Sequence, residues 1–153
     1  MAAEILHSNP DPGAPTPLEL RDRPWHVLSA RLNVRLDELA GTDVWTMDPR
    51  ETAETIVELQ RAQAKLAAVQ AALLAHAERV DVAQLTHATS TEAWLRGEVP
   101  LTPRQAKHAV ALARALDSGR YPATAEALAA GQLQHDQAHE IVCLLYTSPS
   151  PRD

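Results

Sequence analysis

Residues 48–80 read DPRETAETIVELQRAQAKLAAVQAALLAHAERV, and this stretch decides the fold. Asp48 can accept hydrogen bonds from the first free backbone N–H groups of a helix. Pro49 suits the first helical position because the N–H that proline lacks has no partner there. The stretch therefore predicts one long helix that begins at Pro49 and continues to about Val80.

A seam of side chains runs along this predicted helix, because its positions alternate steps of four and three residues. The seam consists of Thr52, Ile56, Leu59, Gln63, Leu66, Gln70, Leu73, Ala77 and Val80. Leucine at d-like sites and glutamine at a-like sites are compatible with a parallel homodimeric coiled coil. The alternative is a spine helix inside one domain, coated by alanines that let other helices approach closely.

The composition favours helices throughout the chain. The hydrophobic fraction is 45%, but alanine dominates it, and the chain has five glycines and no phenylalanine. Alanine is the best helix former, yet it buries little apolar area, so the core must be thin. We therefore predict an all-α fold in which one long spine helix packs with several short helices.

Charge and hydropathy exclude some classes of protein. The formal net charge is -6, and no run of about 18 apolar residues could cross a bilayer. The first residues resemble neither a secretory signal nor a transit peptide, so we expect a cytoplasmic protein without a membrane partner. Cys143 is the only cysteine, which excludes an internal disulfide and a multi-cysteine zinc site within this chain.

Prolines, glycines and helix-capping residues divide the chain into four parts. Residues 1–23 are rich in proline and predict a disordered tail. Residues 24–48 predict a helix that begins near Pro24, ends at Gly41 and is followed by a linker. Residues 49–142 predict the helical domain. Its short helices are expected to be bounded by Ser90, Gly97, Pro100, Thr102, Pro103, Gly119, Pro122 and Gly131, with a last one that begins at about 134–136.

Residues 143–153 form the fourth part and interrupt the alanine-rich helical pattern after Val142. They read CLLYTSPSPRD. One permitted back-translation resembles the mosaic end and adapter arm of transposase-based sequencing libraries. We therefore expect this segment to be a non-native tail, and the helical domain to be truncated at about Val142.

Three segments together resemble a known family. They are Ser90–Leu95 (STEAWL), the stretch from Leu101 to Leu116 that contains LTPRQAK and LARAL, and Ala125–Gly131 (AEALAAG). They resemble the domain of unknown function 222, or 13E12-repeat family, which is common in actinobacteria and usually precedes an HNH endonuclease module. The resemblance implies that any divalent metal and the catalytic residues belong to that missing module. We expect no catalytic residue, metal site or cofactor in this fragment.

A basic face is the candidate binding site. Arg104, Lys107 and Arg114 share one side of a predicted helix, opposite its apolar stripe, and residues 96–120 carry a local charge of +3. Such a face can bind nucleic acid by neutralising phosphates, although charged residues on an amphipathic helix are usually just solvated. His135 and His139 have the spacing of a zinc-binding pair, but no third ligand accompanies them.

Two hypotheses for function remain open at this point. The first is a non-catalytic helical domain of an HNH endonuclease-like protein that assists nucleic-acid binding, with DNA as the partner. The second is a protein-interaction or self-association module built on the long helix.

Overall fold

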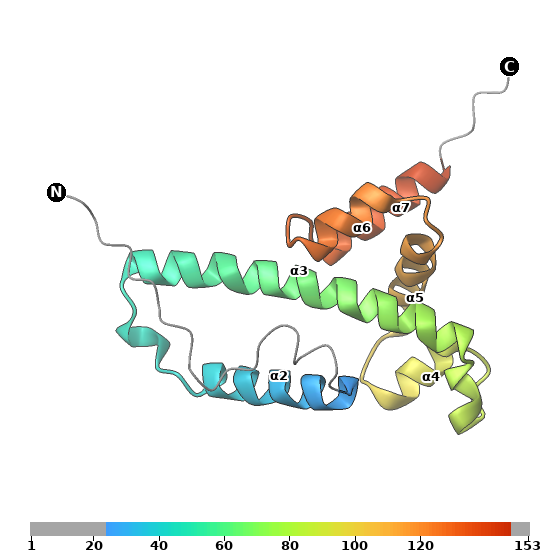
Figure 1. The fold of residues 1–153 in the computed structure, drawn as a ribbon, viewed down its shortest axis with the longest axis horizontal. Coiled ribbons are helices and arrows are strands. Elements are labelled where there is room, and N and C mark those ends of the chain that lie inside the picture. The colour runs from blue at the N-terminus through green and yellow to red at the C-terminus, as the bar shows by residue number, and fades with distance from the viewer. Residues whose placement is uncertain (1–23, 148–153) are drawn as a thin grey trace, which may run out of the picture. The chain divides into compact units, whose positions relative to one another are not determined.

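The computed structural model describes residues 24–147 and confirms the all-α fold. In this part of the chain, six α-helices and two short 3-10 helices make up the regular structure (Figure 1). The chain divides into two compact units, Met1–Thr46 and Met47–Asp153. The tail predicted for residues 1–23 lies outside the described residues. None of the described helices combines the length and the apolar content that a membrane crossing needs.

The first unit contains α2 (Trp25–Ala40) and the 3-10 turn η1 (Val44–Thr46). Pro24 precedes the helix, and the backbone N–H of Gly41 donates to the Asp37 carbonyl at 3.0 Å where it ends. The helix ends at the predicted Gly41, but Pro24 is its N-cap and not, as the sequence suggests, its first helical residue. No residue of α2 is buried.

The second unit is built on α3 (Pro49–Arg79), the predicted long helix. Its N-terminus is a capping box. The Asp48 carboxylate accepts from the backbone N–H groups of Arg50 at 2.7 Å and Glu51 at 2.9 Å, while Glu51 Oε2 accepts from the Asp48 N–H at 3.1 Å. The orphan donors of the first turn are therefore paired, which fixes the helix start.

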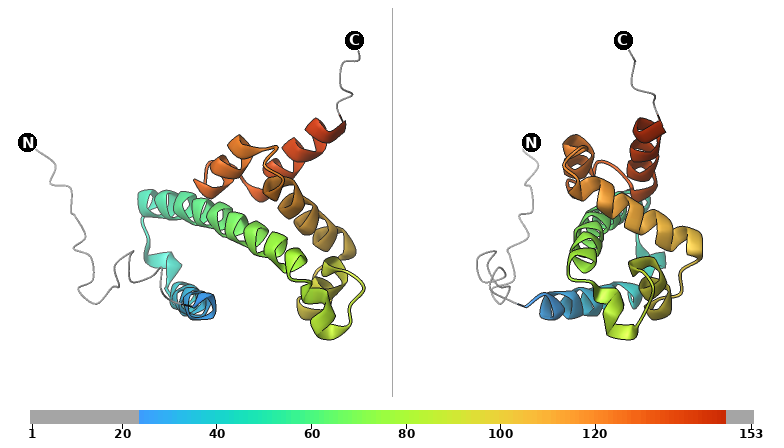
Figure 2. Two further views of the ribbon diagram at one scale, coloured as in Figure 1. Left: turned by 45° about the vertical axis from the view of Figure 1, so that its right-hand side comes forward. Right: turned by 90° about the vertical axis from the view of Figure 1, so that its right-hand side faces the viewer.

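Short helices pack on α3. The turn η2 (Val82–Thr86) leads to α4 (Thr91–Glu98), α5 (Pro103–Asp117), α6 (Pro122–Ala129) and α7 (His135–Thr147). Figures 1 and 2 show α5 beside the C-terminal half of α3, with α6 and α7 next to each other, and the contacts between these elements agree. Side-chain caps set two of these starts: Thr102 and Gln105 form a second capping box at α5, and Ser90 Oγ accepts from the Ala93 N–H at 3.1 Å at α4.

Two boundaries differ from the sequence-based prediction. Gly97 lies inside α4, which ends at Glu98, because the glycine is exposed and a helix tolerates it there at small cost. The last helix does not break at Val142 and instead continues to Thr147. No proline or glycine occurs between Cys143 and Thr147, so no residue of this stretch prevents helix formation.

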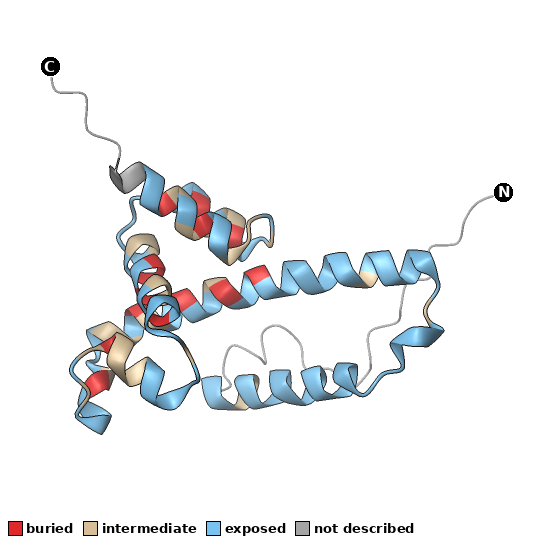
Figure 3. Cartoon of the chain, turned by 180° about the vertical axis from the view of Figure 1, so that it is seen from behind, coloured by how far each residue is buried: buried red, intermediate tan, exposed pale blue. Residues whose placement is uncertain are grey.

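The core uses the alanine face of α3 rather than the leucine seam. Ala64 and Ala67 are buried against Leu112 of α5, Leu128 of α6, and Ala138 and Val142 of α7. Ala71 and Ala75 are buried against Ala113 of α5, and Figure 3 shows the buried positions along α3. Alanine allows the backbones to approach closely, which gives α3 its place as the spine of the domain. The apolar seam residues keep a third to more than half of their surface exposed: Ile56 55%, Leu59 43%, Leu66 36%, Leu73 46% and Val80 58%.

Candidate functional site

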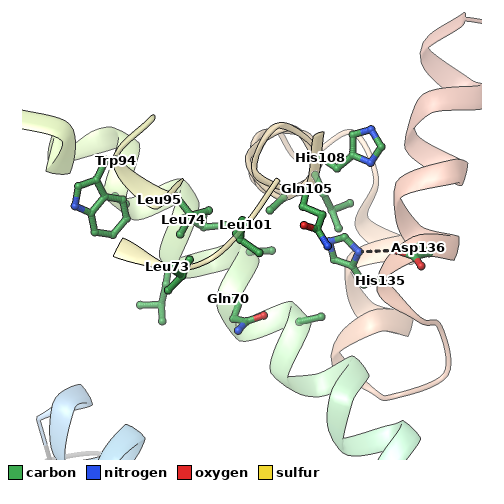
Figure 4. A pocket seen from close by; sticks show the side chains of 16 residues that line it. Gln70, Leu73, Leu74, Trp94, Leu95, Leu101, Gln105, His108, His135 and Asp136 are labelled. Carbon is green, nitrogen blue, oxygen red and sulfur yellow. Dashed lines mark hydrogen bonds and ion pairs between the residues drawn. The ribbon is translucent and has the colours of Figure 1, made fainter. Parts of the chain in front are cut away.

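A pocket of about 670 Å³ lies where α3, α4, α5 and the start of α7 meet. Its lining is Ala67, Gln70, Ala71, Leu73, Leu74, Ala77, Trp94, Leu95, Val99, Leu101, Gln105, His108, Ala109, Leu112, His135 and Asp136. Figure 4 shows that the two ends differ, with Trp94 and the leucines at one and Gln105, His108 and His135 at the other. The cavity therefore has an apolar end and a hydrogen-bonding end.

The apolar end is formed by α3, α4 and the loop before α5. Leu74, Trp94, Leu95 and Leu101 are half-buried there and line the cavity. The sequence favours Trp94 as a core anchor because an indole offers a large apolar surface. The structure places it at the edge of the core, where part of the ring area remains accessible to a bound molecule.

The polar end contains a histidine cluster that the sequence does not reveal. His108 of α5 stacks on His139 of α7 with ring centroids 4.1 Å apart and an interplanar angle of 23°. His135 Nδ1 lies 3.1 Å from Asp136 Oδ1. Burial, and then the neighbouring His108 and His135, lower the pKa of His139, since each disfavours a positive charge on its ring.

His135 and His139 therefore interact with different partners. His135 pairs with the adjacent carboxylate and His139 stacks across to α5, although the sequence places both on one helix face. Among the described residues, no group of three or more His, Cys, Asp or Glu side chains is arranged to hold a metal ion.

The predicted basic face separates into two parts with different environments. Arg114 lies between three helices: its Nε donates to Glu78 Oε2 of α3 at 2.8 Å, and its Nη2 lies 3.1 Å from Glu92 Oε1 of α4. A further hydrogen bond joins Arg114 Nη2 to Glu78 Oε1. Hydrogen bonding to Glu78 raises the pKa of Arg114. The charged guanidinium therefore links α5 to α3 and α4 through its two carboxylate partners.

Arg104 and Lys107 are exposed on the first turns of α5. No described carboxylate lies within ion-pair distance of either side chain. Because Arg114 is neutralised by two carboxylates, only the other two predicted contact residues present unpaired charge on this helix.

The leucine seam of α3 runs into the pocket. Gln70, Leu73 and Ala77 belong both to the seam and to the pocket lining. Exposed apolar side chains therefore recur along the seam from Ile56 to Leu73, with Gln63 and Gln70 between them. The heptad pattern predicts this surface, whereas the pocket depends on tertiary contacts that no local pattern encodes.

Two comparisons with known proteins find no match. A search of the curated proteins finds no significant match to this chain, and neither does a search of the solved structures.

A third comparison identifies the family. The family model described as "Domain of unknown function (DUF222)" matches residues 53–153. The matched region begins inside α3 and includes every helix that forms the core and the pocket. It also includes residues 143–153, so the adapter origin of that segment stays a prediction. The three segments that resemble the family all lie within the match, and the chain belongs to the DUF222 family.

Proposed function

We propose that this domain is a non-catalytic self-association module, in which the leucine seam of α3 packs against the seam of a second copy of the chain. The observation that carries the proposal is that α3 has two different faces, one buried in the domain and one exposed. Its alanine face packs inside the domain, and the Ile56, Leu59, Leu66 and Leu73 side chains stay exposed along one stripe. Exposed apolar side chains aligned on one side of a helix are typical of interaction sites.

The charge pattern of α3 is compatible with a second identical helix. The positions that flank the seam between 55 and 76 are Thr55, Gln60, Ala62, Ala67, Val69, Leu74 and His76, none of which is an acid or a strong base. Like charges therefore do not face each other when two copies approach. Two ion pairs, Arg50–Glu54 and Glu58–Arg61, join charged side chains on other parts of this helix.

The length of the seam is sufficient for a specific contact. Thirty-one residues give α3 a length of roughly 46 Å at about 1.5 Å per residue. Gln63 and Gln70 at a-like sites can hydrogen bond to their counterparts in a parallel, in-register pair, which favours a dimer over larger assemblies.

Sedimentation of the full chain tests the proposal. A dimer has twice the 16.6 kDa mass of one chain. We expect the double variant Leu59→Glu/Leu66→Glu to be a monomer, because it places like charges in the seam. Leu85→Glu is the matched control, since Leu85 is 79% exposed in η2 and lies outside the seam. A wild-type chain that stays monomeric at high concentration, with its seam covered within one chain or solvated, contradicts the proposal.

Nucleic-acid contact is the second candidate function, and the exposed Arg104 and Lys107 favour it. In this version the domain assists a neighbouring HNH endonuclease module, as the family resemblance implies, and the DNA phosphates meet the first turns of α5. Binding must weaken as salt is raised, because each neutralised phosphate releases counterions. Retention on DNA that is unchanged by Arg104→Glu/Lys107→Glu, or that is absent at low salt, rules this candidate out.

A further inference from the structure

The pocket has the size and the asymmetry of a small-molecule site. Its volume of about 670 Å³ falls in the range of roughly 300–1,000 Å³ that is common for ligand pockets. Apolar walls with a few polar groups gathered at one end suit a molecule that has an apolar body and one polar group. The chemistry of the two ends identifies which polar group.

The polar end favours a negative charge. His108 and His135 line it, Arg104 lies close enough to His139 to disfavour protonation of that ring, and Gln105 offers its side-chain amide. The Gln105 Oε1 atom already accepts from the Thr102 N–H at 2.9 Å, so the Gln105 NH₂ group remains as a donor. These groups supply hydrogen-bond donors at the polar end, and the Arg104 cation lies near it.

Two helix N-termini reinforce this preference. Gln105 lies in the first turn of α5, and His135 is the first residue of α7, so the positive ends of both helix dipoles are at this end of the pocket. Asp136 is the one acidic residue in the lining. Its side chain is 97% exposed and pairs with His135, which orients that imidazole rather than forming a site for a cation.

We propose that this pocket binds an amphipathic monocarboxylate. The apolar body lies among Leu74, Trp94 and Leu101, and the carboxylate accepts hydrogen bonds from His108 and His135. The site shares Gln70, Leu73 and Ala77 of its lining with the seam, but the side chains proposed to contact the ligand lie outside the seam.

A fluorescence titration with three ten-carbon probes tests the assignment. In the Trp25→Phe/Trp45→Phe variant of the full chain, Trp94 is the only tryptophan and reports on the apolar end. We expect decanoate to give a saturable change and to bind at least tenfold more tightly than decylammonium, with decanol between them. No saturable change with decanoate, or decylammonium binding as tightly as decanoate, overturns the proposal.

Single substitutions distinguish the contribution of the polar end of the pocket from that of the apolar end. His135→Ala should weaken decanoate at least tenfold and change decanol less than twofold, whereas His76→Ala, on an exposed part of α3 outside the lining, should change neither. Ala109→Phe fills the cavity and should weaken both probes, and thermal unfolding confirms that each variant folds. If His135→Ala weakens decanol as strongly as decanoate, the carboxylate is not at that end.

The same titration on Leu59→Glu/Leu66→Glu tests whether ligand binding in the pocket depends on self-association through the seam. Decanoate binding that persists in this double variant shows that the pocket works without the seam contact. Binding that is lost there, in a chain that remains folded, contradicts a pocket that acts independently.

Discussion

The Arg114 guanidinium of α5 lies against the Glu78 carboxylate of α3, with Nε donating to Oε2 at 2.8 Å and to Oε1 at 3.0 Å. The two residues are 36 positions apart in sequence, and Glu92 of α4 completes the group. Burial raises the pKa of Glu92, but hydrogen bonds from its own backbone and Ser90, together with Arg114, lower it overall. Arg114 therefore holds three helices together at the end of the domain opposite the start of α3.

Removing this cation should weaken the fold. Arg114→Gln leaves Glu78 and Glu92 facing each other without a counter-charge, and since the group is partly exposed we expect a loss of about 1 kcal/mol in the free energy of unfolding. Lys107→Gln is the control, because Lys107 forms no ion pair with a described residue, and its effect should be within about 0.5 kcal/mol. Urea unfolding measures both, and equal effects would contradict a structural role for Arg114.

Gly131 should tolerate no side chain. Its φ is +78°, and a Cβ there would lie 3.1 Å from the Arg61 carbonyl oxygen of α3. Gly131→Ala combines backbone strain with this close approach and should cost about 1–3 kcal/mol. Gly97→Ala is the matched control: a Cβ at Gly97 meets nothing within 4 Å, and alanine should stabilise α4 by up to about 1 kcal/mol. Thermal unfolding should therefore shift in opposite directions.

Enlarging a side chain on the alanine face of α3 should disrupt the core. Ala64 is fully buried, so Ala64→Leu forces the neighbouring helices apart and should cost at least about 1–3 kcal/mol. Ala72→Leu, at an exposed position of the same helix, should change the free energy of unfolding by less than about 0.5 kcal/mol. Similar losses in both variants would mean that this face is not the one that packs.

Acid should destabilise the contact between α5 and α7. His139 faces Arg104 and His108 of α5 and lies near His135 and Asp136 of its own helix, and its pKa is lowered by burial first and by the two histidines next. An unfolded histidine titrates near pH 6.5, so the unfolded chain binds this proton more readily than the folded chain does. The stability that this group contributes is present above about pH 6.5 and is lost as the pH falls below it.

Comparison of two histidine variants isolates this contribution. The wild type should lose more stability than His139→Gln between about pH 7.5 and pH 5.5. His76→Gln, at an exposed position, should behave like the wild type. A pH profile of His139→Gln that parallels the wild type would show that the stacked pair is not the sensitive group.

The helix boundaries could be predicted from the sequence because they depend on local chemistry. Asp48 with Pro49 and Thr102 with Pro103 specify their helix starts through side-chain caps, and Gly131 supplies the positive φ that follows α6. The end of the last helix is harder to predict, because no residue before Pro149 is a local signal for it.

Tertiary contacts could not be predicted in the same way. The heptad pattern draws attention to the leucines of α3, but the domain packs on Ala64 and Ala71, whose small size lets α5 and α6 come close. The heptad pattern shows where apolar residues align along α3. It does not show which face of α3 packs against the rest of the domain. The stacking of His108 on His139 likewise depends on how α5 and α7 meet.

Disulfide trapping shows whether two α3 seams meet in solution. In a Cys143→Ser background, Gln63→Cys places a thiol at an a-like site, while Lys65→Cys places one about half a turn away, near the opposite side of the same helix. Under mild oxidation of the full chain, we expect a cross-linked dimer for Gln63→Cys and far less for Lys65→Cys. Equal cross-linking of the two variants, or none for Gln63→Cys, would contradict a contact between two α3 seams.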